Sequence, residues 1–346
     1  MRIIIKTLLL VFSLITIYFH YIINVSAEIQ YEIYNDMDSG TYKEETTARF
    51  NVLNLDFPDL SLTTLPMKGV VSRYYYLGAQ YSKALDLLNE SKDANPYIMY
   101  NESIKSEIFD KLGVIDSALV YAEKAFTGIP HNQKHYLLLS KIYLSNGNYS
   151  KLDSVFKIVE KKNRPALWNF YLVSALTRED SISNYMRKKA KEAIKKFPGT
   201  EEYSQIKLSS LYILYGKEQI DKSIELSNLG SKYFDEENYR LAAKYYGDAA
   251  NLNPLEYTFH ENAGISNYRF GYYDKSIPYL NQVVDSLNPS TGKSEFVLAQ
   301  TYAALEDFEK ACKYIYDSSR FDYSPAYPLI GDYCAKAQND KSTQTE

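Results

Sequence analysis

One pattern of small and large residues recurs near the C-terminus with a period of about 35 residues. Each copy has two small residues, and these are Gly230 and Ala242, Gly264 and Ser276, and Ala299 and Ala311. Large residues stand between and after them, and they include Tyr233, Tyr246, Leu280, Tyr302 and Ile315. Small residues let two helices approach closely, and large residues fill the space between neighbouring pairs. The pattern therefore predicts helical hairpins that stack, since one hairpin cannot bury its apolar face alone.

This pattern resembles the tetratricopeptide repeat (TPR), a helix–turn–helix unit of about 34 residues. The resemblance implies an all-α fold, a TPR-type α-solenoid that follows an N-terminal signal peptide or membrane anchor. Stacked repeats present an extended surface that usually binds other molecules and rarely catalyses a reaction. We therefore expect a binding protein and not an enzyme.

A weaker form of the pattern divides the rest of the chain into segments. Pro96 and Pro130 close two consecutive repeats. The pattern decays after Pro165 and returns at Ser223, which predicts an N-terminal arm of about four repeats, the first divergent, and a C-terminal arm of three. The expected segments are 1–27 for the signal peptide or transmembrane anchor, 28–165 for the N-terminal arm, 166–222 for a degenerate repeat and joint, 223–324 for the C-terminal arm, 325–338 for a capping helix and 339–346 for a disordered tail.

The N-terminal segment carries Arg2 and Lys6 before an apolar run from Thr7 to Val25. As a secretory signal, it would be removed after the small-residue site Val25-Ser26-Ala27. As a membrane anchor, its roughly 19 apolar residues would just span the hydrocarbon core. Both alternatives predict that the chain after residue 27 is exported, with membrane contact only through residues 1–27 if they are not cleaved.

Two further resemblances concern the source and location of the chain. The abundance of Ile, Lys, Asn and Tyr resembles proteins of AT-rich bacteria, including many Bacteroidetes. This implies a place in the periplasm or at the cell surface, tethered to the inner membrane if the anchor stays. The stretch 125–143 resembles a phrase in Bacteroidetes proteins that look like O-antigen ligases or polymerases with a periplasmic TPR tail. The similarity covers roughly residues 7–165, and the chain lacks the multi-span catalytic part of those proteins.

Charge and motifs argue against several other functions. The net charge is −4 and no long run of Lys or Arg occurs, which disfavours nucleic acid as a partner. No phosphate-binding loop, paired-cysteine metal motif or Gly-x-Ser-x-Gly elbow is present. His131 and His135 have the spacing of two metal ligands on one helix face, but no third ligand is near. We therefore expect no catalytic residue, no metal and no cofactor.

The two cysteines lie close to the C-terminus. Cys312 falls in the second helix of the last repeat, and Cys334 falls in the capping helix that should pack on it. A disulfide between them is one alternative in an oxidising compartment, and two small buried thiols are the other.

The binding surface is expected on the first helix of each repeat, which lines the concave face of a TPR stack. In the C-terminal arm the expected partner-binding residues are Ser231, Phe234, Glu261, Ile265, Tyr268, Lys293, Phe296 and Gln300. In the N-terminal arm they are Arg73, Tyr76, Glu107 and Lys141. The C-terminal set mixes aromatic, apolar and single charged side chains, which suits an extended peptide or a helix, with Phe234, Tyr268 and Phe296 as anchors.

Two functions are compatible with these features. The favoured hypothesis is a non-catalytic, exported TPR scaffold that mediates protein–protein interaction through its concave surface. The alternative is an accessory subunit of a cell-envelope glycan ligase or polymerase of the O-antigen type. The partner is accordingly a protein or peptide in the first case, and a membrane glycan enzyme in the second.

Overall fold

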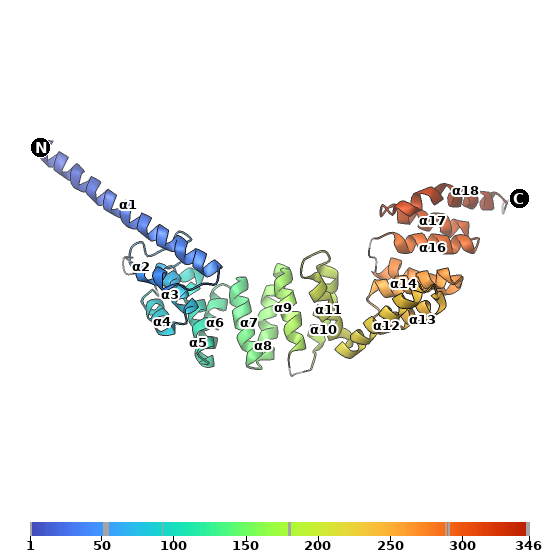
Figure 1. Cartoon of the computed structure of the whole chain (residues 1–346), viewed down its shortest axis with the longest axis horizontal. Helices are drawn as coiled ribbons and strands as arrows, with labels where there is room; N and C mark the ends of the chain where they lie inside the picture. Colours follow the sequence, from blue (N-terminus) through green and yellow to red (C-terminus); the bar gives the residue numbers. More distant parts are fainter. Residues whose placement is uncertain are drawn as a thin grey trace. The chain divides into compact units, whose positions relative to one another are not determined.

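The computed structural model describes residues 2–50, 55–91, 93–178, 181–287, 289 and 291–343 (Figure 1). The described residues form helices joined by short connections, with one isolated bridge between Leu60 and Pro66 and no strand. This confirms the all-α class. The chain divides into two compact units, Met1–Ser181 and Ile182–Glu346, and each is described by itself.

Unit 1 contains two N-terminal helices, a series of hairpins and a further helix (Figure 1). The N-terminal helices are α1 (Arg2–Asp38) and α2 (Glu44–Arg49). The hairpins pair α3 (Met67–Leu77) with α4 (Tyr81–Glu90), α5 (Tyr100–Lys111) with α6 (Ile115–Gly128), and α7 (Gln133–Ser145) with α8 (Tyr149–Val159). The further helix, α9 (Pro165–Leu176), packs beside α7.

Unit 2 begins with α10 (Asn184–Lys196) and α11 (Tyr203–Tyr215). Its hairpins pair α12 (Lys217–Asp235) with α13 (Tyr239–Leu252), α14 (Tyr257–Arg269) with α15 (Tyr273–Asn281), and α16 (Lys293–Ala304) with α17 (Phe308–Ser319). The π-helical segment Gln282–Leu287 continues α15, and α18 (Tyr327–Thr343) ends the unit.

The boundaries of these elements can be compared with the expected segments. The expected joint 166–222 holds most of α9, all of α10 and α11, and the start of α12, and the division between the units falls inside it. Helix α18 continues past the boundary expected at residue 338 and ends at Thr343. Residues 344–346 of the expected tail lie outside the described residues.

The hairpin turns share one geometry in both units. Each turn has a single residue with a left-handed backbone, two positions before the second helix begins, and these residues are Ala79, Gly113, Gly147, Glu237, Gly271 and Glu306. The next residue donates its N–H to a carbonyl in the last turn of the first helix, as in Val114 to Phe109 at 2.9 Å and Tyr272 to Asn267 at 2.8 Å. These are the bonds of a Schellman motif, which ends a helix by satisfying its free carbonyls. The periodic sequence therefore encodes a periodic turn.

The small residues of the pattern lie where the two helices of a hairpin approach most closely. A Cβ atom on Gly264 would stand 2.6 Å from Cγ of Leu280, and one on Gly230 would stand 2.8 Å from the Tyr246 ring. The Ser276 hydroxyl donates across the same contact to the carbonyl of Gly264 at 2.8 Å. The prediction that small residues allow close helix approach is confirmed.

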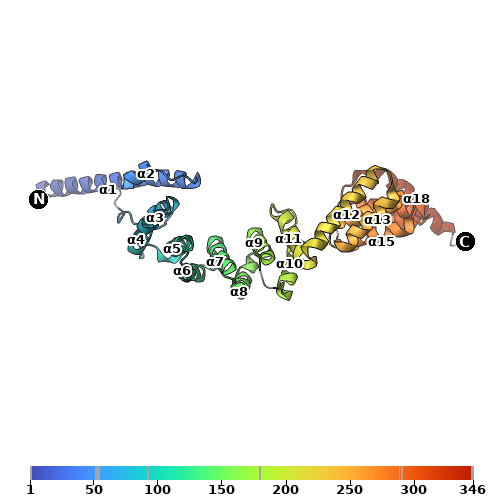
Figure 2. The same ribbon diagram turned by 60° about the horizontal axis from the view of Figure 1, so that its bottom comes forward.

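Helix α1 has two parts with different surroundings (Figure 2). Its first part projects away from the other helices of unit 1, and its large apolar side chains from Ile4 to Ile23 are mostly exposed. In its second part, Ile29 and Ile33 are fully buried in a cluster with residues of α3. The chain therefore uses one continuous helix both as an exposed apolar rod and as a core element.

A buried carboxylate fixes the end of α1. Asp36 accepts hydrogen bonds from Tyr74 of α3 at 2.7 Å and from Thr46 of α2 at 2.8 Å, and it pairs with Lys43. Chiefly through the Lys43 hydrogen bond, these contacts hold the pKa of Asp36 below its usual range. Asp36 thus joins α1, α2 and α3.

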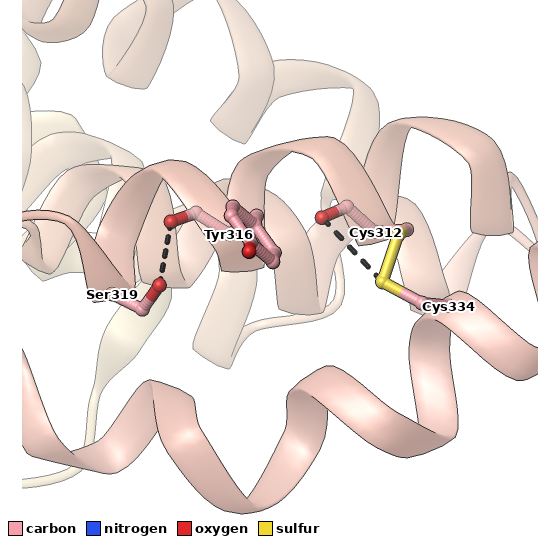
Figure 3. The surroundings of a disulfide bond; sticks show 4 residues. All are labelled: Cys312, Tyr316, Ser319 and Cys334. Carbon is pink, nitrogen blue, oxygen red and sulfur yellow. Dashed lines mark hydrogen bonds between the residues drawn. A yellow bond between two sulfur atoms is a disulfide. The ribbon is translucent and has the colours of Figure 1, made fainter.

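A disulfide joins Cys312 of α17 to Cys334 of α18 (Figure 3). The two Cα atoms are 4.7 Å apart, and the two cysteines are 22 residues apart in the sequence. On the same stretch of α17, the Ser319 hydroxyl donates to the carbonyl of Tyr316 at 2.7 Å (Figure 3). The last helix of unit 2 is therefore covalently attached to the last hairpin.

Candidate protein-binding surface

An open groove of about 890 Å³ lies on the first-helix side of unit 1. Its lining includes four apolar residues, which are Ile129, Leu137, Leu138 and Phe170. Its lining also includes three cationic residues, which are Lys134, Lys141 and Arg164. Among the described residues, no ion-pair partner of the Arg164 guanidinium is found. The groove therefore combines an apolar lining with basic groups.

Helix α7 supplies most of this lining because its two faces differ. His135, Tyr136 and Leu139 are buried in the core. Leu137 and Leu138, which lie between them in the sequence, face the groove instead. The Asn132 side chain caps the helix by accepting from the N–H groups of Lys134 and His135 at 2.9 and 3.3 Å. This cap sets the start of α7 and hence the register of its groove face.

The expected N-terminal set of partner-binding residues is brought together by charged pairs. Arg73 of α3 pairs with Glu107 of α5, and the Arg73 guanidinium lies over the Tyr76 ring, 5.0 Å from its centroid. Lys134 of α7 also reaches Glu107, at 3.4 Å. Lys141 also lines the groove, further along α7, and it pairs with Asp110 of α5 at 3.2 Å. These ion pairs thus link α3 to α5 and α5 to α7, and two of them involve the groove residues Lys134 and Lys141.

The expected C-terminal set contains one group that is already engaged inside the protein. Glu261 of α14 is only 6% exposed. One of its carboxylate oxygens accepts from the Ser294 hydroxyl at 2.7 Å, and the other pairs with Lys293 at 3.3 Å. Both partners belong to α16, so Glu261 and Lys293 link two neighbouring hairpins.

The expected aromatic anchors are half-buried and pack within unit 2. Phe234 meets Tyr239 with ring centroids 5.3 Å apart, and Tyr268 meets Tyr273 at 5.9 Å. Each pair joins the end of one helix to the start of the next, so these rings cover a hairpin turn. Phe296 packs against Tyr323 at 5.3 Å. Each of these three rings is therefore already engaged in a ring contact within unit 2.

The remaining members of the C-terminal set differ in exposure. Ser231 is exposed on α12, whereas Ile265 and Gln300 are half-buried on α14 and α16. Ile265 packs against the cluster around Leu280. Unit 2 therefore presents isolated polar groups rather than an apolar groove at these positions.

Sequence reasoning missed most of the groove. Leu137, Leu138 and Lys134 precede the expected residue Lys141 by one and two helical turns, so a helical projection of α7 would have grouped them with it. Phe170 comes from the region where the repeat pattern fades, and Arg164 lies at the end of the expected N-terminal arm, directly before that region. Their placement depends on α9 packing beside α7, which the pattern did not predict.

The two histidines that have metal-ligand spacing lie in different surroundings. His131 is exposed in the turn before α7, and His135 is buried in the core. Burial lowers the pKa of His135 below its usual value. Within the described ranges, no group of three or more His, Cys, Asp or Glu side chains is arranged to hold a metal ion.

Helix α1 contains a candidate membrane span. Its segment Ile4–Asp38 includes a window of mean hydropathy 2.0, and none of that window is buried. In the part of the chain that the structure describes, this is the one helix long and apolar enough to cross a membrane. Length and composition alone fit both a signal sequence and an anchor.

The repeated hairpins and their shared turns define an all-α protein of the TPR-type α-solenoid class. No family model matches the chain. Solved structures that are similar to it have low sequence identity. A tetratricopeptide repeat protein from Parabacteroides merdae is 11% identical with a TM-score of 0.30, and the match covers 90% of this chain and 99% of that one.

Two other similar structures cover less of the chain. The TPR2AB domain of yeast Sti1, in a complex with pHSP90, is 15% identical with a TM-score of 0.31 and covers 78% of this chain and 97% of its own. YrrB, described as a TPR protein with an unusual peptide-binding site, is 16% identical with a TM-score of 0.27, and the match covers 72% and 94% of the two chains.

Proposed function

We propose that this protein is a non-catalytic scaffold that captures a protein partner on the first-helix face of unit 1. The observation that carries the proposal is the groove beside α7, where Leu137, Leu138 and Phe170 lie among Lys134, Lys141 and Arg164. Apolar side chains give a partner surface to bury, and the separate cationic groups orient it. An extended peptide with apolar and acidic side chains matches both features.

Unit 1 supports this role better than unit 2 does. The aromatic residues expected to act as anchors in unit 2 already cover hairpin turns, as Phe234 and Tyr268 do. Glu261 is committed to Ser294 and Lys293. A partner at those positions would have to displace intramolecular contacts of the rings and of a buried carboxylate. In the groove beside α7, an acidic partner would exchange only the partly exposed ion pairs of Lys134 and Lys141, and its apolar lining is open.

A pulldown with two matched variants tests the proposal. The tagged full chain is purified from solubilised native membranes as wild type, Leu138→Glu and Val120→Glu, and captured proteins are identified by mass spectrometry. Val120 is an exposed apolar residue on α6, so Val120→Glu controls for a new charge outside the groove. We expect at least one protein to be lost with Leu138→Glu and retained with Val120→Glu, with unchanged circular dichroism in both variants.

The identity of the captured protein distinguishes the two functional hypotheses. A multi-span glycan ligase or polymerase would favour the accessory-subunit alternative. A soluble exported protein would favour the general scaffold. If all captured proteins bind equally well to Leu138→Glu, the groove is not the binding site and the proposal is wrong.

We further propose that α1 is retained as a membrane anchor and that the rest of the chain is exported. Ser26 is 2% exposed, and its hydroxyl accepts from the Gln30 side chain at 3.0 Å. Cleavage after Ala27 would cut α1 between these partners and would remove Val25 and Ser26 from the packed end of unit 1. The fold therefore uses residues on both sides of the expected cleavage point.

The anchor is tested by mass spectrometry of the mature N-terminus together with carbonate extraction of native membranes. We expect the mature chain to keep residues 2–27 and to stay in the membrane pellet. A mature N-terminus at Glu28 would overturn the anchor and favour a cleaved signal peptide.

A further inference from the structure

Residues 55–66, the described part of the chain between α2 and α3, form a connection that contacts α1. The Phe57 ring meets the Phe19 ring edge-on, with 5.0 Å between the ring centroids. Phe19 belongs to the candidate membrane span, and Phe57 belongs to the part of the chain that follows it. A segment outside the span therefore touches the span itself.

Hydrogen bonds hold this connection in place. The Gln30 side chain of α1 accepts from the N–H of Leu62 at 2.9 Å, and the carbonyl of Asp59 accepts from the N–H of Met67 at 2.7 Å. The Lys68 ammonium pairs with Asp56 at 2.8 Å. The connection is thus fixed both to α1 and to the start of α3.

Two apolar side chains of the connection remain exposed despite these contacts. Phe57 is 41% exposed and Leu62 is 72% exposed. Single exposed apolar residues are normal in water-soluble proteins. Here Phe57 is continuous with the apolar surface of α1, because its ring touches Phe19.

The depth of Phe19 in a bilayer follows from helix geometry. A hydrocarbon core of about 30 Å corresponds to about 20 helical residues at 1.5 Å per residue. If that core holds the exposed residues from Ile4 to Ile23, Phe19 lies about 6 Å inside its outer boundary. A ring in contact with Phe19 is then at the level where aromatic side chains gather at membrane interfaces. Tyr18 and Tyr21 are exposed at the same level.

We propose that residues 55–65 form a membrane foot, in which Phe57 inserts into the interfacial layer of the bilayer around α1. Leu62 is held beside Gln30, about 10 Å beyond Ile23 along the helix, and stays outside the hydrocarbon core. The proposal rests on α1 being the retained anchor proposed above. The occupant of this apolar surface is lipid, since the surface is continuous with the segment that lipid surrounds. An anchor helix alone leaves unit 1 free to tilt relative to the membrane plane. A second membrane contact beside the helix restricts that tilt and so limits which face of unit 1 points away from the membrane.

Tryptophan fluorescence tests the foot with the full chain. The protein contains one tryptophan, Trp168, which is 1% exposed on α9 and provides the baseline signal. Phe57→Trp adds a tryptophan in the part of the foot that inserts, and Leu62→Trp adds one in the part that lies outside the hydrocarbon core. Tyr97→Trp is the matched control, because Tyr97 is 84% exposed elsewhere in unit 1. Each protein is placed in phosphatidylcholine vesicles with and without bromine atoms on the acyl chains, and vesicle flotation shows that the protein is bound.

We expect bromolipid to quench about half of the added emission for Phe57→Trp, to quench Leu62→Trp much less, and to leave Tyr97→Trp and the wild-type protein almost unchanged. If the variants float with the vesicles but Phe57→Trp is quenched no more than Tyr97→Trp, the foot is wrong while the anchor stands. If the wild-type protein does not float, the anchor fails and the foot fails with it.

Discussion

Replacing Gly264 by alanine tests whether close helix approach is what the repeat pattern encodes. Gly264 lies in the middle of α14, where alanine is the better helix former by about 1 kcal/mol. The new methyl group would stand 2.6 Å from Cγ and 2.7 Å from Cδ2 of Leu280, and 3.4 Å from the carbonyl oxygen of Ser276. Carbon atoms in contact are normally about 3.5–4.0 Å apart, so Leu280 or the helix must move by about 1 Å.

The packing cost is expected to exceed the gain in helix propensity. Leu280 is fully buried in a cluster with Val297 and Leu298, so it has no free space to enter. Overpacking of this kind costs about 1–3 kcal/mol, and an overlap near 1 Å belongs at the upper end. After subtraction of the propensity gain, Gly264→Ala should destabilise unit 2 by about 2 kcal/mol. For a unit of this size that lowers Tm by about 4–8 °C.

Gly331→Ala is the matched control in the same unit. Gly331 is a helical residue of α18, and a Cβ atom there would meet nothing within 4 Å. Only the propensity gain applies, so this variant should raise stability by up to about 1 kcal/mol. Thermal and urea unfolding followed by circular dichroism measure both variants.

A double-mutant cycle separates the contact from other causes. In a Leu280→Ala background the added methyl group would have room, so the same Gly264→Ala change should become neutral or stabilising. If Gly264→Ala lowers the free energy of unfolding equally in both backgrounds, or if it stabilises the wild-type protein, the close-approach explanation of the repeat pattern is refuted.

Three further predictions concern charge and covalent links. Asp36→Asn should destabilise unit 1 by about 1–3 kcal/mol at pH 7 in urea unfolding, and this difference should shrink as pH falls below the ordinary pKa of 3.8, because the folded-state pKa is lowered. Burial raises the pKa of Glu295 above its ordinary value of 4.5. Stability of unit 2 is therefore lost as the pH rises through the folded-state pKa of Glu295. Glu295→Gln should stabilise unit 2 at pH 7 and make its stability depend less on pH. Replacing Cys312 and Cys334 by serine should cost about 3 kcal/mol and increase amide exchange in α18; unchanged exchange would mean that the bond does not hold the helix.

The sequence pattern predicted the hairpins well because the contacts that form them are local. Gly264 and Leu280 are close in the chain and meet within one hairpin. A left-handed turn residue is also a local requirement, and glycine meets it at Gly113, Gly147 and Gly271. At Glu237 a non-glycine residue adopts the same backbone, so residue type alone would not have located that turn.

The candidate binding surface was harder to predict because it depends on neighbouring repeats. Phe234 and Tyr268 have the residue types of partner anchors, yet their rings cover their own hairpin turns. Glu261 is buried by residues of the next repeat, Lys293 and Ser294. The groove includes Phe170 from α9, whose region carries little of the repeat pattern. Residue type therefore indicated which side chains could bind a partner, whereas the packing of neighbouring helices decided whether those side chains were accessible to one.

The disulfide has a consequence for where unit 2 first opens. A stack in which each hairpin contacts only its neighbours normally loses structure from its ends, where a helix has one partner instead of two. At the C-terminal end, α18 cannot leave while Cys334 is joined to Cys312. In an oxidising compartment, proteases and hydrogen exchange should therefore reach α18 more slowly than they do under reducing conditions.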